Sequence, residues 1–233
     1  MGYSWGRLEE GPMTPLIDAT EMYLRTVWEL EEEGIVPIRA RLVERLALSA
    51  PAVSETVARL EHEGLLRIAA DRTLELTDHG RELAIGVMRK HRLAELLLTE
   101  VIGLEWEQVH NEACRWEHVI SDAVERRLVE LLGSPTMCPH GNPIPGMPTA
   151  APEEHLVSMA RAARTGGMAT IRRISEQLQV DVDAMRYLRE HGIRPGTTAA
   201  LRLDAGHVVV DVDGTSVKID DDAAAHVYVA PAA

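Results

Sequence analysis

The spacing of apolar residues changes along the chain, from a helical period of three to four positions at the start to alternation near the end. Helical spacing marks residues 20–33 and the shorter segments 39–46 and 50–63. Between the two shorter segments, Ser49 and Pro51 stand where a helix cap and a first-turn proline are expected. The pattern therefore predicts a run of short helices at the N-terminus.

A hairpin is predicted immediately after these helices, over residues 65–77. Polarity alternates at 73–76, and Ala70 and Asp71 provide the turn. Two short helices joined by a tight turn are the helix-turn-helix arrangement, in which the second helix enters the major groove of DNA. With the hairpin as its wing, residues 13–84 are predicted to form a winged helix-turn-helix DNA-binding domain.

Polar and basic side chains of this domain are candidates for DNA contact. On or near the second helix they are Ser49, Pro51, Ser54, Glu55, Thr56 and Arg59, and those placed to reach phosphates are Arg39, Arg41 and Arg72. The net charge of −13 argues against general affinity for nucleic acid. Basic residues nevertheless outnumber acidic ones over 38–92, so a DNA-binding face is not excluded. A winged helix that binds protein instead of DNA is the alternative.

Longer helical patterns follow, one beginning near residue 80, one spanning 104–120 and one reaching residue 132. Their apolar content exceeds what one small core needs, which predicts a helical dimer interface. A run rich in proline and glycine, residues 133–152, is predicted to be a linker. We therefore predict a dimerisation and metal-binding domain with its linker over residues 85–152.

Beyond the linker, short segments of alternating polarity predict strands. They are 198–203, 207–212, 216–219 and 225–229, separated by turn signals at Ala205-Gly206 and Asp213-Gly214. Residues 153–233 are thus predicted to form a small β-rich domain. The whole chain would be mainly α-helical with a smaller β part.

Composition narrows the class of protein. The chain of 233 residues is 45% hydrophobic and 26% charged, with no apolar run of membrane length and no apolar stretch in its first residues. We expect a soluble, cytoplasmic protein that does not associate with membranes. Of its two cysteines, Cys114 stands among histidines and glutamates, which favours a free thiol ligand over a disulfide.

Metal ligation is the most specific chemistry in the helical region, because good ligands recur there at helical spacing. They are His91 and Glu95 in one segment, and His110, Cys114, Glu117 and His118 in the next. At about 1.5 Å of rise per residue, His110 and His118 stand about 12 Å apart, too far to share one ion. Two sites are therefore implied. Cys138 and His140 lie in the predicted linker, and we interpret them as incidental.

The chain resembles the metal-dependent regulators of the diphtheria toxin repressor and iron-dependent regulator type. The resemblance is strong through about Gly146 and looser beyond it. It is carried by T-E-M-Y-L-R-T (20–26), R-A-R-L-V-E-R-L (39–46), G-L-L-R (64–67), D-R-T-L-E-L-T (71–77), V-M-R-K-H-R-L-A-E (87–95), E-A-C-R-W-E-H-V (112–119) and G-N-P-I-P-G (141–146).

The resemblance implies a homodimeric, Fe²⁺-activated transcriptional repressor that binds palindromic operator DNA and controls iron homeostasis genes, with an SH3-like β-barrel at its C-terminus. It implies a primary site of Met22, Cys114, Glu117 and His118, and an ancillary site of His91, Glu95 and His110 that Glu176 and Gln179 complete from the last domain. Co²⁺, Ni²⁺, Mn²⁺ or Zn²⁺ is expected to replace iron in vitro, since such ligands bind Ni²⁺ or Zn²⁺ at least as tightly.

Two alternatives remain open at this point. A manganese-responsive regulator of the same family is the nearer one, although that branch lacks a thiol at the position of Cys114. A metalloenzyme is the other, because His, Glu and Cys can hold a catalytic ion with an open position. One residue departs from the family, which commonly has Gln where this chain has Glu55.

Overall fold

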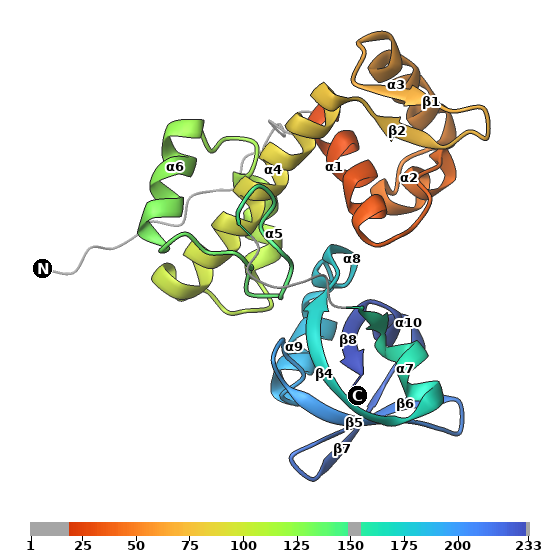
Figure 1. Cartoon of the computed structure of the whole chain (residues 1–233), viewed down its shortest axis with the longest axis vertical. Helices are drawn as coiled ribbons and strands as arrows, with labels where there is room; N and C mark the ends of the chain where they lie inside the picture. Colours follow the sequence, from red (N-terminus) through yellow and green to blue (C-terminus); the bar gives the residue numbers. More distant parts are fainter. Residues whose placement is uncertain (1–18, 149–154, 232–233) are drawn as a thin grey trace, which may run out of the picture.

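The computed structural model describes residues 19–148 and 155–231, and its first part is helical (Figure 1). The helices are α1 (Ala19–Glu32), α2 (Arg39–Leu46) and α3 (Ala50–His62). As predicted, Ser49 caps α3, where its hydroxyl accepts a hydrogen bond from the Ala52 amide at 3.4 Å. The apolar faces of these helices enclose one core, in which Leu24, Leu42 and Leu60 are fully buried.

A two-stranded antiparallel hairpin follows α3, formed by β1 (Leu66–Ile68) and β2 (Leu74–Leu76). Arg72 takes a left-handed conformation in its turn, with a φ of 73°. At the end of the hairpin the Thr77 hydroxyl accepts from the Gly80 amide and caps the next helix. A Cβ at Gly80 would come within 1.9 Å of the Leu65 carbonyl oxygen, so glycine permits this close approach.

The middle of the chain is built around α4 (Asp78–Leu96), a long helix that runs from the N-terminal helices into a second helical cluster (Figure 1). It continues as a π-helical turn, η1 (Leu97–Ile102), before α5 (Val109–Trp116) and α6 (Asp122–Leu131). The helix predicted over 104–120 is therefore shorter than expected, because a turn at 106–108 precedes α5.

The segment after α6 is not the simple linker that its composition predicts. Its described residues, 133–148, pack into the protein, and the side chains of Cys138, His140, Asn142 and Ile144 are buried. Asn142 donates to the carbonyl of Ile174 at 2.8 Å. The run turns back on itself at 138–142, where the Cys138 amide donates to the Asn142 carbonyl at 2.8 Å and the Gly141 amide donates to the Cys138 carbonyl at 3.0 Å, so its central residues face the interior. Residues 149–152 of the predicted linker lie outside the described part.

Over residues 155–231, the described part of the C-terminal domain is a six-stranded antiparallel sheet with four small helices. Its strands are β3 (Val157–Ser158), β4 (Gly167–Ile174), β5 (Thr198–Asp204), β6 (His207–Val212), β7 (Thr215–Ile219) and β8 (Val227–Pro231), and its helices are α7 (Met159–Thr165), α8 (Glu176–Gln179), α9 (Val182–Glu190) and α10 (Asp221–Ala225). The predicted strands at 198–229 are present, whereas β3, β4 and all four helices were missed.

The strand order is β3-β8-β4-β5-β6-β7, so β3 and β7 are the edges and no ladder of hydrogen bonds closes the sheet. Of the predicted SH3-like β-barrel, the residues described form a six-stranded sheet that is not closed. The central strand β4 pairs with both β8 and β5, and it carries the chain directly to α8. Figure 1 shows α8 at the edge of this domain nearest to α5. Over 19–148 and 155–231, every helix is too short or too polar to cross a bilayer.

Candidate metal centre

Two helices and the C-terminal domain bring a group of metal-binding side chains together in the interior. His91 and Glu95 stand one turn apart on α4, His110 lies on α5, and Glu176 begins α8. All four side chains are buried, and they offer donor atoms within 4.8 Å of one another. The predicted ancillary ligands are therefore close in space, although Glu176 is far from the others in the chain.

The distances within this group are those of polar atoms that share one small space. Glu95 Oε1 lies 3.1 Å from His91 Nε2 and 3.4 Å from His110 Nδ1. Glu176 Oε2 lies 3.2 Å from the same His110 nitrogen and 3.5 Å from His91 Nε2. Gln179, at the other end of α8, is also buried, and its Nε2 donates to the Ile174 carbonyl at 2.7 Å.

Several atoms of this group make no well-aligned hydrogen bond among the described residues, although His110 Nδ1 and Glu176 Oε2 lie 3.2 Å apart. The atoms concerned are Glu95 Oε2, Glu176 Oε2, His110 Nδ1 and Gln179 Oε1. Leaving a buried polar atom unpaired costs about 1–3 kcal/mol, and native proteins seldom do so without a functional reason. Carboxylate oxygen, amide oxygen and imidazole nitrogen are ligands that a divalent ion accepts. The donor set therefore fits a cation.

Cys138 and His140 also reach this group, although we had interpreted them as incidental. His140 Nδ1 lies 3.2 Å from Glu95 Oε1, and the donors of Glu95, Cys138 and His140 lie within 4.8 Å of one another. Both side chains are buried. The one feature of the sequence that could have indicated this is that Cys138, His140 and Asn142 occupy every second position in a run rich in proline and glycine.

Of the remaining predicted ligands, His118 lies beside Glu117, which directly follows α5. Its carboxylate accepts from Arg25 Nη1 at 2.6 Å to each oxygen, and it lies 2.6 Å from His91 Nδ1 and 3.1 Å from His118 Nε2. His118 Nδ1 in turn lies 2.6 Å from the Glu21 carboxylate on α1. Arg25 and Glu21 were not among the predicted site residues, and through them α1 reaches this group.

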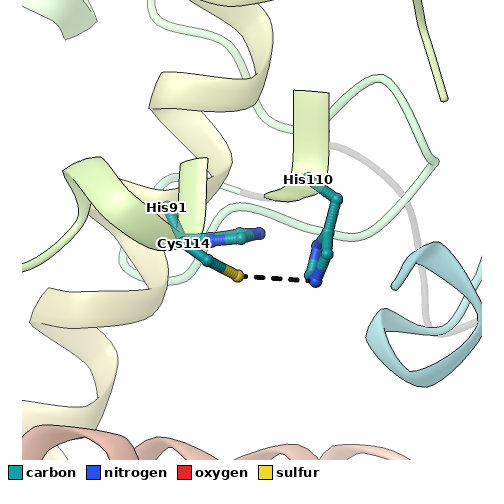
Figure 2. Close-up of side chains that lie close together, drawn as sticks. All are labelled: His91, His110 and Cys114. Carbon is teal, nitrogen blue, oxygen red and sulfur yellow. Dashed lines mark hydrogen bonds between the residues drawn. The ribbon is translucent and has the colours of Figure 1, made fainter. Parts of the chain in front are cut away.

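Cys114 connects the two groups. Its sulfur lies 3.5 Å from His110 Nε2, and Figure 2 shows both side chains converging with His91. The donors of these three residues lie within 4.8 Å of one another. The two expected sets of ligands are thus adjacent, because His91 and His110 lie close both to Cys114 and to Glu95 and Glu176. Spacing along single helices did not reveal this.

Burial and neighbouring charges shift the pKa values of several side chains in this region. Burial by itself would raise the pKa of Glu117, but Arg25, His118 and His91 hold that pKa well below its usual range. Burial likewise opposes ionisation of Cys114, yet Arg25 and His110 lower its pKa well below the ordinary value. A lowered pKa favours the thiolate, which is the form that binds metals. Burial raises the pKa of Cys138 well above its usual value, and Glu95 adds to the effect.

Met22 lies on α1, half-buried against the N-terminal core. Its carbonyl accepts from the Thr26 hydroxyl at 2.8 Å. It is on the same helix as Glu21 and Arg25, which contact His118 and Glu117.

The candidate DNA-contacting residues are on the outer side of the N-terminal domain. Most of them are exposed, namely Arg41, Ser49, Pro51, Ser54, Glu55, Arg59 and Arg72, while Arg39 and Thr56 are half-buried. The Arg59 guanidinium bonds to Glu63 at 2.9 Å, and Arg41 pairs with Glu44 at 2.7 Å. Both ion pairs are exposed and weak, so either arginine can turn to a phosphate.

A helical N-terminal domain with exposed polar side chains on and near α2 and α3, joined to buried groups of metal-binding side chains, is typical of a metal-dependent DNA-binding regulator. Comparison with known proteins agrees. The model of the iron dependent repressor N-terminal DNA-binding domain matches residues 15–74, that of the metal binding and dimerisation domain matches 77–146, and that of the FeoA domain matches 161–231. The chain belongs to the iron-dependent repressor family, which confirms the resemblance seen in its motifs.

Individual relatives cover most of the chain. The diphtheria toxin repressor of Corynebacterium glutamicum is 50% identical over 218 residues, 91% of this chain and 96% of the relative. The iron-dependent repressor IdeR of Mycobacterium tuberculosis is 51% identical over 202 residues, 83% of this chain and 88% of the relative. These relatives are repressors, which gives the metalloenzyme alternative no support.

Solved structures show the same architecture. A manganese-dependent transcriptional repressor in complex with manganese has a TM-score of 0.78 at 31% identity, and covers 91% of this chain and 100% of its own. The IdeR of T. acidophilum has a TM-score of 0.73 at 28% identity, and covers 93% of this chain and 99% of its own.

Proposed function

We propose that this chain is a homodimeric, Fe²⁺-activated repressor that binds palindromic operator DNA and controls iron homeostasis genes. The observation that carries the proposal is the buried group of His91, Glu95, His110 and Glu176, whose unpaired atoms fit a cation and which joins α4 and α5 to the C-terminal domain. In this account residues 13–84 form a winged helix-turn-helix, residues 85–152 the dimerisation and metal-binding domain, and residues 153–233 an SH3-like domain.

Two adjacent sites are proposed for each chain. The ancillary site consists of His91, Glu95 and His110 with Glu176 and Gln179, and Cys138 and His140 stand beside Glu95 as further donors. The primary site consists of Met22, Cys114, Glu117 and His118. A divalent ion supplies positive charge among the carboxylates and the Cys114 thiolate when it is bound. The ligands come from α1, from the central helices and from the C-terminal domain, so binding favours one arrangement of all three.

Iron is favoured as the physiological metal by two observations. The curated relatives at about half identity are iron-dependent repressors, and Cys114 supplies a thiolate ligand. Manganese is the specific alternative, because a solved structure at 31% identity is a manganese-dependent repressor. Repression measured in reporter strains grown with iron or with manganese distinguishes the two metals. Iron is supported if it alone represses at cellular concentrations, and manganese if it represses where iron does not.

The proposed function is tested by a mobility-shift titration on palindromic DNA under anaerobic conditions. We expect retardation with Fe²⁺ and a loss of retardation after chelation, because the ligands draw the DNA-binding helices into one arrangement. A scrambled duplex of the same length and charge is the control for phosphate attraction alone. Equal retardation with and without metal would contradict the proposal.

Met22 gives a specific test of the link between α1 and the metal. A Met on an amphipathic helix is more often core than ligand, so Met22→Leu keeps the packing while removing the thioether. We expect both Met22→Leu and Met22→Ala to bind metal about tenfold or more weakly, a loss typical of changes at a metal site. Both variants should also lose metal-dependent DNA binding. Isothermal titration with Co²⁺ measures the metal affinity. Unchanged metal affinity with metal-dependent DNA binding intact would show that Met22 is only core.

A substitution at Glu55 tests how the protein recognises the bases of its operator. It is exposed on α3, where its carboxylate can only accept hydrogen bonds and is repelled by phosphates. Gln donates and accepts, so Glu55→Gln is expected to tighten binding to the palindrome that the family prefers, by about 1–3 kcal/mol per half-site. Fluorescence anisotropy with the metal-loaded protein measures the change. Unchanged or weaker binding would refute a role for Glu55 in base recognition.

A further inference from the structure

The C-terminal domain contacts the DNA-binding helices directly, at the end of α1. Arg173 on β4 donates its Nη2 to the carbonyl oxygen of Glu32, the last residue of α1, at 3.3 Å. The last carbonyls of a helix have no intrahelical donor, and a cation there also complements the helix dipole. The same guanidinium lies over the ring of Tyr228 on β8, 4.6 Å from its centroid. This Arg173–Tyr228 pair therefore presents a cation to the end of α1.

A buried ion pair lies beside this contact. Glu33 directly follows α1 and accepts from Arg45 of α2, with Nη1 3.1 Å from Oε1, and their side chains are only 4% and 12% exposed. Tyr228 is close enough to this pair for Glu33, after burial, to raise the pKa of its hydroxyl. Because α2 packs against α3, the Glu33–Arg45 ion pair links the end of α1 to the helix-turn-helix.

The same region is tied to the proposed metal ligands. Ser175 immediately precedes Glu176, its amide donates to the carbonyl of His226 at 2.9 Å, and its hydroxyl lies 2.9 Å from His226 Nδ1. His226 begins the turn into β8, two positions before Tyr228. The position of Glu176 is therefore coupled to the position of Tyr228 through two hydrogen bonds.

A second connection runs through Arg92 on α4, which is fully buried. Its guanidinium bonds to both carboxylate oxygens of Glu32, at 3.0 and 2.7 Å, and its Nε donates to Glu176 Oε1 at 3.1 Å. Glu32 is thus held through its side chain by the metal-binding domain and through its carbonyl by Arg173. The end of α1 is the point at which all three domains meet.

We propose that the C-terminal domain is a clamp on the DNA-binding domain, in which Arg173, stacked on the ring of Tyr228, holds the end of α1 next to the Glu33–Arg45 ion pair. The proposal rests on the proposed function, because it takes Glu176 as a metal ligand. Metal that fixes Glu176 then fixes the clamp, and the clamp fixes the angle at which each helix-turn-helix is presented to its half-site. Arg173 and Tyr228 are positioning residues in this account.

The test uses the full-length protein with Arg173→Gln and Tyr228→Leu together. The double variant Arg202→Gln and Tyr187→Leu is its matched control, because these residues are partly exposed on the same domain, with described contacts to Asp204, Asp211, Lys218 and His191 of that domain. Tyr228→Phe keeps the ring under Arg173 and serves as the conservative variant. Three quantities are measured, namely DNA affinity with Fe²⁺, affinity for Fe²⁺ alone, and amide exchange of residues 28–46 without DNA.

We expect the clamp variant to lose about tenfold in DNA affinity, within the usual range of coupling between sites. Exchange over residues 28–46 should quicken, metal affinity should stay within about twofold, and the control and Tyr228→Phe proteins should behave as wild type. Unchanged DNA affinity and exchange would overturn the clamp. So would an equal loss of metal and DNA affinity, which would mean only that the domain supports the metal site. If the wild-type protein binds DNA equally with and without metal, the proposed function is wrong. The comparison of amide exchange over residues 28–46 still shows whether Arg173 and Tyr228 hold the end of α1.

Discussion

Glu95→Gln is expected to lower the affinity of the buried group for a divalent ion by about 100-fold or more, the upper end of what even indirect partners of a metal contribute. Glu95 is fully buried and lies against His91, His110 and His140, so its negative charge faces imidazoles on three sides. An amide of the same shape removes the charge and keeps the volume. Repression by the metal-loaded protein should fall with the loss of affinity.

The measurement for Glu95→Gln is anaerobic titration calorimetry with Fe²⁺, accompanied by thermal unfolding of the metal-free protein. Glu100→Gln is the matched control, because Glu100 is exposed on the π-helical turn that continues the same helix. The control should bind metal as the wild type does. A folded Glu95→Gln protein with wild-type metal affinity would show that the buried group is not a metal site.

Leu131→Arg is expected to convert the dimer to a monomer and to weaken operator binding by about 10²–10⁴-fold, the usual gain from joining two binding modules. Leu131 is 63% exposed at the end of α6, on the same face as Val124, and this face forms an apolar groove. A soluble protein seldom exposes such a face unless a partner covers it, and the family model for this segment is a dimerisation domain. A buried arginine without a partner would oppose association.

Sedimentation equilibrium and DNA binding by anisotropy together check this prediction. Leu203→Arg is the control, since Leu203 is an exposed leucine on β5 of the C-terminal domain. That variant should remain dimeric and bind DNA normally. A Leu131→Arg protein that stays dimeric would place the interface elsewhere.

Local signals were enough to predict the helices near the DNA-binding surface. The α2 bounds, the Ser49 cap and the hairpin after α3 follow from apolar periodicity and turn chemistry, which act over a few residues. His91 and Glu95, or His110 and Cys114, are also local pairs at helical spacing. Such features need no knowledge of the rest of the chain.

Contacts between residues far apart in the sequence were harder to predict. Helical spacing over 104–120 predicts that His110 and His118 belong to separate groups, yet it does not show that Cys114 lies near His91 of another helix. Cys138 and His140 looked incidental, because proline and glycine around them predict a linker and conceal a buried run. Strand β4 was missed because its apolar positions are interrupted by Arg172 and Arg173, one of which contacts α1.

The central claim, that the helices and the C-terminal domain together enclose two metal ions, is tested most directly by anomalous diffraction. Crystals of the Co²⁺-loaded protein, measured on either side of the cobalt edge, would show where the ions bind. We expect two peaks per chain, one bounded by Glu95, His91, His110 and Glu176, the other by Met22, Cys114, Glu117 and His118. A fully loaded protein with no peak at the Glu95 group, or with both peaks elsewhere, would contradict it.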